Sequence, residues 1–290
     1  WGDQTYIGAP AYIGAVVIFL FVLALFLIKG RLKWWIAGGS ILALLLSWGR
    51  NLKFLTVLFI DYFPLYDKFR AVSSIQVLIE LCFPILAIVG VHKFLNSTIE
   101  KEIKLKALKY ATAIVGGTAM IFLLFKSVLF GFSGSNDGVF IQQLGANFVR
   151  ALKEDRKSMF TIDTLRSLVF VLLAVSLFWF YLKGKLKENL LLIGIGVLLI
   201  ADLIPIDWKY VNNSNFVSSR AFNKPFIANK ADQEVAKDKG HYRVYDLTAN
   251  PFNSAKASYF HNALGGYHAA KPGRIQDLYE FYLVKNDVGV

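Results

Sequence analysis

The sequence predicts a mainly α-helical, polytopic membrane protein with about six transmembrane helices. Three observations support this fold class: long stretches almost free of charge, short basic segments between them, and a composition that is 56% hydrophobic with a mean hydropathy of +0.48. A bilayer core of about 30 Å asks for roughly 20 apolar residues in a helix, and tilt or flanking anchors accommodate shorter runs. The six predicted spans are Ala11–Ile28, Trp34–Trp48, Ile75–His92, Tyr110–Phe125, Leu165–Leu182 and Leu190–Ile204.

The second stretch is the shortest, and its ends indicate how it lies. Trp34, Trp35 and Trp48 bracket it. Indole rings favour the headgroup level of a bilayer, so this stretch also reads as a span. A single apolar run can instead be a buried helix of a soluble domain. Six such runs in succession argue against that alternative.

Basic residues alternate between the loops and predict the orientation. Short loops rich in Lys and Arg stay on the cytoplasmic side. The first, third and fifth loops are therefore placed on the cytoplasmic side. The basic residues that support this placement are Lys29, Arg31, Lys33, Lys93, Lys101, Lys104, Lys106, Lys109, Lys183, Lys185 and Lys187. The longer loops 49–74 and 126–164 are placed outside. Both termini then face outward, so that residues 1–204 form the membrane domain and residues 205–290 an extracytoplasmic extension.

The net charge of +12 would suggest nucleic acid as a partner of a soluble protein. Here the predicted topology explains much of the charge, and no RNP, zinc-finger or helix-turn-helix pattern is present, so nucleic acid is rejected. The histidines of the extension, His241, His261 and His268, lack close metal-ligand spacing, and no metal site is predicted. No Walker loop, GxSxG elbow or Rossmann fingerprint assigns a cofactor.

Both predicted outer loops contain amphipathic patterns. In the first, apolar residues between Phe54 and Tyr62 fall at helical spacing, which predicts an interfacial helix ended by Pro64. In the second, an apolar residue recurs every fourth position from Phe140 to Leu152, which predicts a surface-lying helix. This second helix is either a brace resting on the membrane or a lid over a site.

Asp67 and Arg70 follow the first interfacial helix and precede the third span. An arginine binds phosphate through two parallel hydrogen bonds, so a lipid phosphate or pyrophosphate is the natural ligand of Arg70 at this depth. The alternative is that Arg70 anchors the chain at the interface and pairs with Asp67.

Ionisable residues inside a bilayer are costly and mark functional sites. Glu80 lies within the third span, four residues before Pro84, whose ring removes the hydrogen bond that the Glu80 carbonyl would accept. Asp202 lies near the outer end of the sixth span. If the two helices are adjacent, these carboxylates border one outward-facing cavity together with Asp67 and Arg70. The alternatives are a purely structural partner for Glu80 and a solvated helix-end position for Asp202.

The extension differs in composition from the spans, being rich in Asn, Lys, Tyr and Phe. Residues 231–239 predict a short helix stopped by Gly240, and residues 242–247 alternate like a strand. Residues 273–284 are predicted to be helical. The segment is therefore expected to be part of an α/β or α+β unit that continues past Val290, and the sequence is expected to be a piece of a longer protein.

Several motifs resemble the YfhO family of bacterial multipass membrane proteins, in the form seen in Bacteroidetes-type members. The resemblance rests on Trp1–Gln4, Gly8–Ala15, Pro64–Arg70, Ala201–Pro205, Tyr259–His261, Gly265–His268 and Gln276–Leu278. It covers essentially the whole chain, and none of these motifs is a catalytic signature.

The resemblance implies an architecture similar to the GT-C glycosyltransferases of the bacterial cytoplasmic membrane. Such a protein would transfer sugar from a polyprenyl-phosphate carrier to a cell-envelope polymer on the outer face. The acidic residues of that family lie in a first outer loop that would precede Trp1, so no residue here is assigned a catalytic role and the fragment alone is expected to be inactive. Two alternatives stay open: a transporter or flippase gated by Glu80 and Pro84, and a noncatalytic envelope-assembly scaffold.

Overall fold

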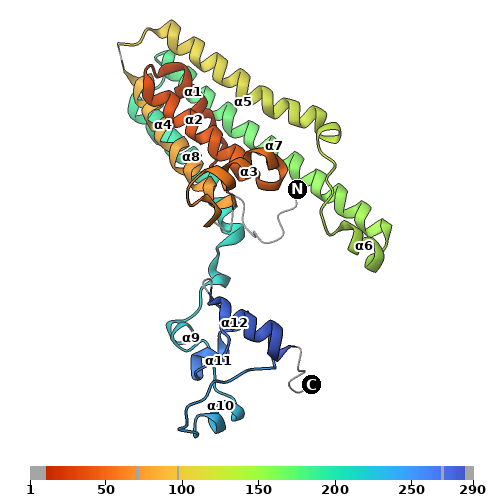
Figure 1. Ribbon diagram of the computed structural model, residues 1–290. Helices are drawn as coiled ribbons and strands as arrows, with labels where there is room; N and C mark the ends of the chain where they lie inside the picture. The colour runs from red at the N-terminus through yellow and green to blue at the C-terminus, as the bar shows by residue number, and fades with distance from the viewer. Residues whose placement is uncertain (1–10, 69–71, 97, 269–270, 285–290) are drawn as a thin grey trace. The chain divides into compact units, whose positions relative to one another are not determined.

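The computed structural model describes residues 11–68, 72–96, 98–268 and 271–284, and the chain divides into two compact units, Trp1–Asn212 and Asn213–Val290. The first unit is a bundle of helices (Figure 1). Its helices are α1 Ala15–Leu27, α2 Arg31–Ser47, α3 Lys53–Tyr62, α4 Val77–Leu95, α5 Lys101–Leu129, α6 Asp137–Leu144, α7 Ala146–Leu182 and α8 Glu188–Tyr210. Short 3-10 turns, Gly49–Leu52, Tyr66–Lys68 and Val72–Gln76, lie between α2 and α4.

Four helical segments of the described chain are long and apolar enough to cross a membrane: Ser73–Leu95, Lys101–Leu129, Ala146–Leu182 and Glu188–Asn215. A fifth crossing results if α2 and the following helix Gly49–Tyr62, bent by 106° from it, count as one span. α1 is apolar but has only 13 residues. Each of the six predicted stretches contains a helix, although the first becomes helical only at Ala15, and the last continues through Pro205 to Tyr210.

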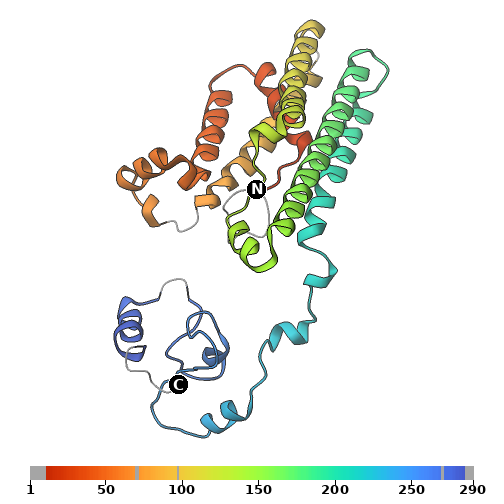
Figure 2. The ribbon, with the colours of Figure 1, turned by 90° about the vertical axis from the view of Figure 1, so that its right-hand side faces the viewer.

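α1 lies at the centre of the first unit. It packs against α4, α5, α7 and α8, and Val16, Phe19 and Leu23 are completely buried there. α4 approaches it closely at Gly90, where an added Cβ would lie 2.4 Å from the Cβ of Ala24. α7 and α8 pack along each other as an antiparallel pair (Figure 2). A helix as short as α1 is thus held by its neighbours over most of its surface, with Ile18 and Phe26 exposed.

The link between α5 and α7 contains α6, which packs on α7. The surface helix predicted over residues 140–152 is present as two helices, because Gly145 takes a φ of +86° and breaks it. Arg156 on α7 donates two hydrogen bonds of 2.9 Å to the carboxylate of Asp137, and the N–H of Gly134 donates a third. These donors, the guanidinium first, hold the pKa of the Asp137 carboxyl below its ordinary value. The helix predicted in loop 49–74, between Phe54 and Tyr62, is confirmed as α3.

The second unit contains α9 Ser219–Asn223, α10 Lys230–Val235, α11 Lys256–Phe260, α12 Gly273–Leu278 and a π-helical turn, Tyr279–Leu283. The predicted helices at 231–239 and 273–284 are therefore present, the first ending early. Asn229 and Asp232 form a capping box at the start of α10. Asp232 also faces His261 at 3.3 Å.

The predicted α/β or α+β character of the extension is wrong for the described residues, which contain no strand. Residues 242–247 alternate, but a ladder needs a paired run on a neighbouring segment. Val244 makes a single parallel bridge with Ala263, through two backbone hydrogen bonds of 2.8 Å. The segment that contains Ala263 then turns away at Gly265. The next residue, Gly266, donates its N–H to the carbonyl of Pro251. Pairing therefore stops after one residue.

Candidate functional site: a buried ion pair beside a cavity

The sequence-predicted candidates do not all meet in one place. Arg70 lies outside the described residues. Asp67 pairs with its exposed neighbour Lys68, with 2.6 Å between Oδ2 and Nζ. Glu80 lies on α4 with an exposed side chain. The hydrogen-bond and ion-pair partners found for Asp202 are residues of α1, of the segment before it and of α7, so the outward-facing cavity formed by all four residues stays a prediction.

Asp202 lies on α8 with no exposed surface. The alternative that it is a solvated residue at a helix end is therefore wrong. The hydroxyl of Tyr12 donates to its Oδ1 at 2.7 Å, and the backbone N–H of Val16 donates to its Oδ2 at 3.3 Å. Val16 is in the first turn of α1, whose N–H groups have no partner within the helix. Asp202 thus caps α1 from another helix.

Arg166 on α7 supplies the charge opposite Asp202. Its Nη2 lies 3.5 Å from Oδ1 of Asp202 and donates to the Tyr12 hydroxyl at 2.7 Å, while its Nη1 donates to the Asp202 carbonyl at 3.2 Å. The Nε of Arg166 is buried without a hydrogen-bond partner among the described residues. Removing either charge from such a pair leaves the other buried and uncompensated. The pair therefore ties α7, α8 and the start of α1 together.

Gly14 permits this close approach. Its φ is +96°, a conformation that residues with a Cβ rarely adopt, and an added Cβ would lie 3.1 Å from Oδ2 of Asp202. The chain can therefore turn into α1 while the carboxylate reaches the Val16 N–H.

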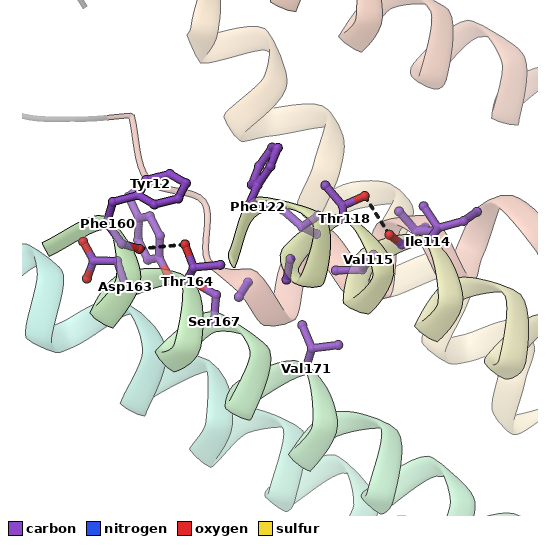
Figure 3. A pocket seen from close by; sticks show the side chains of 14 residues that line it. Tyr12, Ile114, Val115, Thr118, Phe122, Phe160, Asp163, Thr164, Ser167 and Val171 are labelled. Atoms are coloured by element: carbon purple, nitrogen blue, oxygen red, sulfur yellow. Dashed lines mark hydrogen bonds between the residues drawn. The ribbon is translucent and has the colours of Figure 1, made fainter. Parts of the chain in front are cut away.

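A cavity of about 490 Å³ lies next to the ion pair, between α1, α5 and α7 (Figure 3). Tyr12 belongs to both, because its hydroxyl joins the ion pair while its side chain lines the cavity. The other lining residues are Ala15, Ile18, Val22, Ile114, Val115, Thr118, Ala119, Phe122, Phe160, Asp163, Thr164, Ser167 and Val171. This volume is within the range of small-molecule sites, about 300–1,000 Å³.

The two ends of the cavity differ in polarity. Tyr12, Asp163 and Thr164 gather at one end with Phe160, whereas Ile114, Val115 and Thr118 lie toward the other (Figure 3). Val22 lies about two turns beyond Ala15, or about 10 Å further along α1. The cavity thus has one end with more polar groups and one that is more apolar, about 10 Å apart along α1.

Two residues of this site are missed by the sequence analysis. Arg166 is the second residue of the predicted span Leu165–Leu182. The rule that singles out Asp202, an ionisable residue inside an apolar stretch, also applies to Arg166. Tyr12 carries no comparable signal, because a tyrosine at the end of an apolar run is common in any membrane protein.

The fold belongs to the class of helical proteins that contain several helices long and apolar enough to cross a membrane. No group of three or more potential metal ligands occurs within the described part of the chain. No family model, curated protein or solved structure matches this sequence.

Proposed function

We propose that this chain is the membrane-embedded part of a protein that handles a lipid-linked substrate, with hydrocarbon of the substrate held in the cavity between α1, α5 and α7. The observation that supports this most directly is the polarity gradient of that cavity. An amphiphile is the kind of ligand that matches an apolar end and a polar end within one site.

The proposed topology has six crossings, with α1 counted as a short central span and α2 as another. The links from α1 to α2, from α4 to α5 and from α7 to α8 carry the basic residues and are proposed to face the cytoplasm. The polar end of the cavity, near the start of α1 and the middle of α7, then faces outward. Residues 205–290 would lie outside a bacterial cytoplasmic membrane.

The specific activity that we propose is transfer of sugar from a polyprenyl-phosphate carrier to an envelope polymer, as the resemblance to the YfhO family implies. In that mechanism Arg70 would bind the phosphate of the carrier, and a carboxylate that is assigned to no residue of this sequence would deprotonate the acceptor hydroxyl. General-base catalysis of this kind contributes roughly 10²–10⁴-fold.

A second candidate function is transport or flipping of a lipid-linked or polar solute. The buried charge pair of Asp202 and Arg166 favours it, since transporters place paired ionisable residues inside their helix bundles. In this case the pair would open and close during turnover, whereas in a transferase it would stay closed.

Lipid occupancy of the cavity can be tested by photo-crosslinking. The chain would be reconstituted into nanodiscs that contain a diacyl lipid with a diazirine in one acyl chain, and the labelled peptides would be mapped. The matched pair of variants is Ala119→Phe, which fills the cavity, and Ala113→Phe, which places the same ring on an exposed position of α5.

We expect Ala119→Phe to lower labelling of the cavity-lining positions by at least about threefold, and Ala113→Phe to leave it unchanged. Equal labelling in the parent protein and in Ala119→Phe would contradict lipid binding at this site. Loss of labelling in both variants would attribute the effect to α5 rather than to the cavity.

A further inference from the structure

The segment that follows α8 exposes its large apolar side chains. α9 has no buried residue. Phe222 on α9 is 75% exposed, and Ile227, just beyond this helix, is 88% exposed. Val211, Phe216 and Val217 are exposed as well, so that large apolar side chains reach the surface repeatedly over residues 211–227. Exposed apolar surface concentrated in one part of a molecule marks a contact with a partner or with a membrane.

Local contacts hold this segment in place. The Ser218 side chain caps α9 by accepting the N–H of Ala221. The ring of Phe226 packs edge-on against Tyr259 of α11, with 5.4 Å between the ring centroids. Phe226 is therefore turned toward α11, whereas its neighbour Ile227 is turned to the surface. The exposure of Ile227 is thus a property of the folded segment.

The charges of this segment have one sign. No Asp or Glu lies between Lys209 and Lys230, and the other basic residues of this stretch are Arg220 and Lys224. Arg220 and Lys224 lie two residues on either side of Phe222, and neither takes part in an ion pair found among the described residues. Basic side chains beside exposed apolar ones are the pattern with which a segment binds a membrane surface that carries anionic lipids.

The segment begins where α8 would leave the membrane. The helical stretch Glu188–Asn215 is long and apolar enough to cross, and Trp208 and Tyr210 near its end are exposed. Exposed aromatic rings at a helix end mark the headgroup level. Phe222 comes seven residues after Asn215, so it lies at most about 25 Å from the end of that stretch, whatever path the chain takes. The membrane surface is therefore within reach of the segment.

We propose that this segment, residues 211–230, lies on the anionic surface of the membrane at which α8 ends. Phe222 and Ile227 would insert below the headgroups, and Arg220 and Lys224 would bind the phosphates of anionic lipids. A soluble protein with an acidic face would match the same charges. The covalent tether through α8 favours the membrane, because it supplies this surface at a high effective concentration. The inference rests on the proposed crossing by α8 and is independent of any ligand in the cavity.

The test measures the depth of a fluorescent label in nanodiscs that contain the full chain. The background is Cys82→Ala, which removes the single cysteine of the sequence, and a bimane is attached to one introduced cysteine. The positions compared are Asn223→Cys beside Phe222, Leu247→Cys at an exposed apolar position elsewhere in the second unit, and Ile200→Cys at an exposed position of α8. Quenching is measured with one lipid that carries a nitroxide near its headgroup and another that carries it near the end of its acyl chain.

In discs of phosphatidylcholine with phosphatidylglycerol, we expect the shallow nitroxide to quench the label at position 223 at least about twofold more than the label at position 247. Discs of phosphatidylcholine alone should lose most of this difference, because the basic side chains then have no anionic headgroup to bind. Equal quenching at the two positions in the anionic discs would overturn the inference. Quenching at position 223 that does not depend on phosphatidylglycerol would overturn the role given to Arg220 and Lys224.

The label at position 200 separates a failure of this inference from a failure of the proposed topology. If the deep nitroxide quenches position 200 but the shallow one does not quench position 223, α8 crosses the membrane and only the surface contact is wrong. If neither position is quenched, the crossing by α8 fails as well. Labelling of the cavity in Ala119→Phe is a separate measurement and does not depend on either result.

Matched variants, each with the label at position 223, test the two parts of the contact. Phe222→Ser removes an inserted ring, and Leu247→Ser is its control. Charge is removed by Arg220→Gln with Lys224→Gln, and the control is Lys237→Gln with Lys239→Gln, at exposed positions outside the segment. The test variants should lower the quenching and the controls should not. An equal loss in test and control variants would contradict a specific role of the segment. If the label is shielded from water only in discs that hold two copies of the chain, a second copy covers the segment and the inference is wrong.

Discussion

α1 and α5 are both apolar helices of the first unit, yet they have opposite environments. α1 has 13 residues and is buried along almost its whole length, with Phe19 and Leu23 completely inaccessible. α5 has 29 residues and exposes large apolar side chains, including Leu124 at 70% and Val128 at 84%. In a bilayer these exposed side chains of α5 would contact lipid. The length of an apolar helix therefore identifies it as a candidate membrane crossing. Whether it lies at the centre of the bundle depends on its contacts with the neighbouring helices.

This difference has a physical cause. A helix with apolar residues on all sides can be buried by protein or by lipid equally well. α1 is fixed at the centre by features that are specific to it: the Asp202 cap at its first turn and the close approach of Gly90 to Ala24. α5 has no comparable buried polar tie to α8. Substitutions at these features should therefore affect α1 much more than α5.

Among substitutions at the features that fix α1 in place, the largest effect is expected for Asp202→Ala. This change leaves Arg166 without its carboxylate and the first turn of α1 without its cap. Breaking one side of a buried pair costs about 3–5 kcal/mol, and the partial exposure of Arg166 places the expected loss near about 3 kcal/mol. The measurement is the free energy of unfolding of the purified chain in mixed micelles.

The control for that prediction is the double variant Asp202→Leu with Arg166→Met, which removes both charges. It should recover most of the lost stability, because two apolar side chains of similar size need no desolvated partner. A single variant Asp202→Ala that is no less stable than Tyr12→Phe, which removes only one hydroxyl, would contradict a buried ion pair.

The next largest effect is expected for Gly90→Val. Its Cβ would lie 2.4 Å from the Cβ and 2.9 Å from the Cα of Ala24, so α1 and α4 must separate. Overpacking of this kind costs about 1–3 kcal/mol. Gly117→Val on α5 is the matched control, since an added Cβ there has nothing within 4 Å. Equal thermal midpoints for the two variants would show that the α1–α4 contact can separate at no cost in stability.

The sequence predicts the helical stretches and α3 well, because apolar runs and their spacing are local signals. It does not reveal the break at Gly145, since glycine is tolerated inside helices and the adjoining pattern continues past it. It also does not reveal that Asp202 meets Tyr12 and Arg166, because partners from distant segments leave no spacing to count. The strand predicted at 242–247 fails for the same reason: alternation shows which residues suit a strand, but not whether a partner strand exists.

A pH dependence is expected at the link that attaches α5 to α7. The lowered pKa of Asp137 means that its pairing with Arg156 contributes stability above the ordinary carboxyl pKa of about 4, and that this contribution is lost as the pH falls through the lowered value. Pepsin cleavage within 130–145 should therefore be slow at pH 5 and increase at lower pH. The increase should already be present at pH 5 in Arg156→Met. A parent protein that is cleaved equally fast at pH 5 would contradict the pairing.

The smallest effect is expected for Leu124→Ala on the exposed face of α5, where the unfolding free energy should change by no more than about 0.5 kcal/mol. A lipid or detergent tail surrounds this side chain in the folded protein and in the unfolded reference state alike, so truncation loses little. The same substitution at Leu23 of α1 should cost about 2–5 kcal/mol, because it leaves a cavity in a packed core. If Leu124→Ala cost as much as Leu23→Ala, the exposed face of α5 would have to be covered by protein. A second copy of the chain or another subunit, rather than lipid, would then contact Leu124.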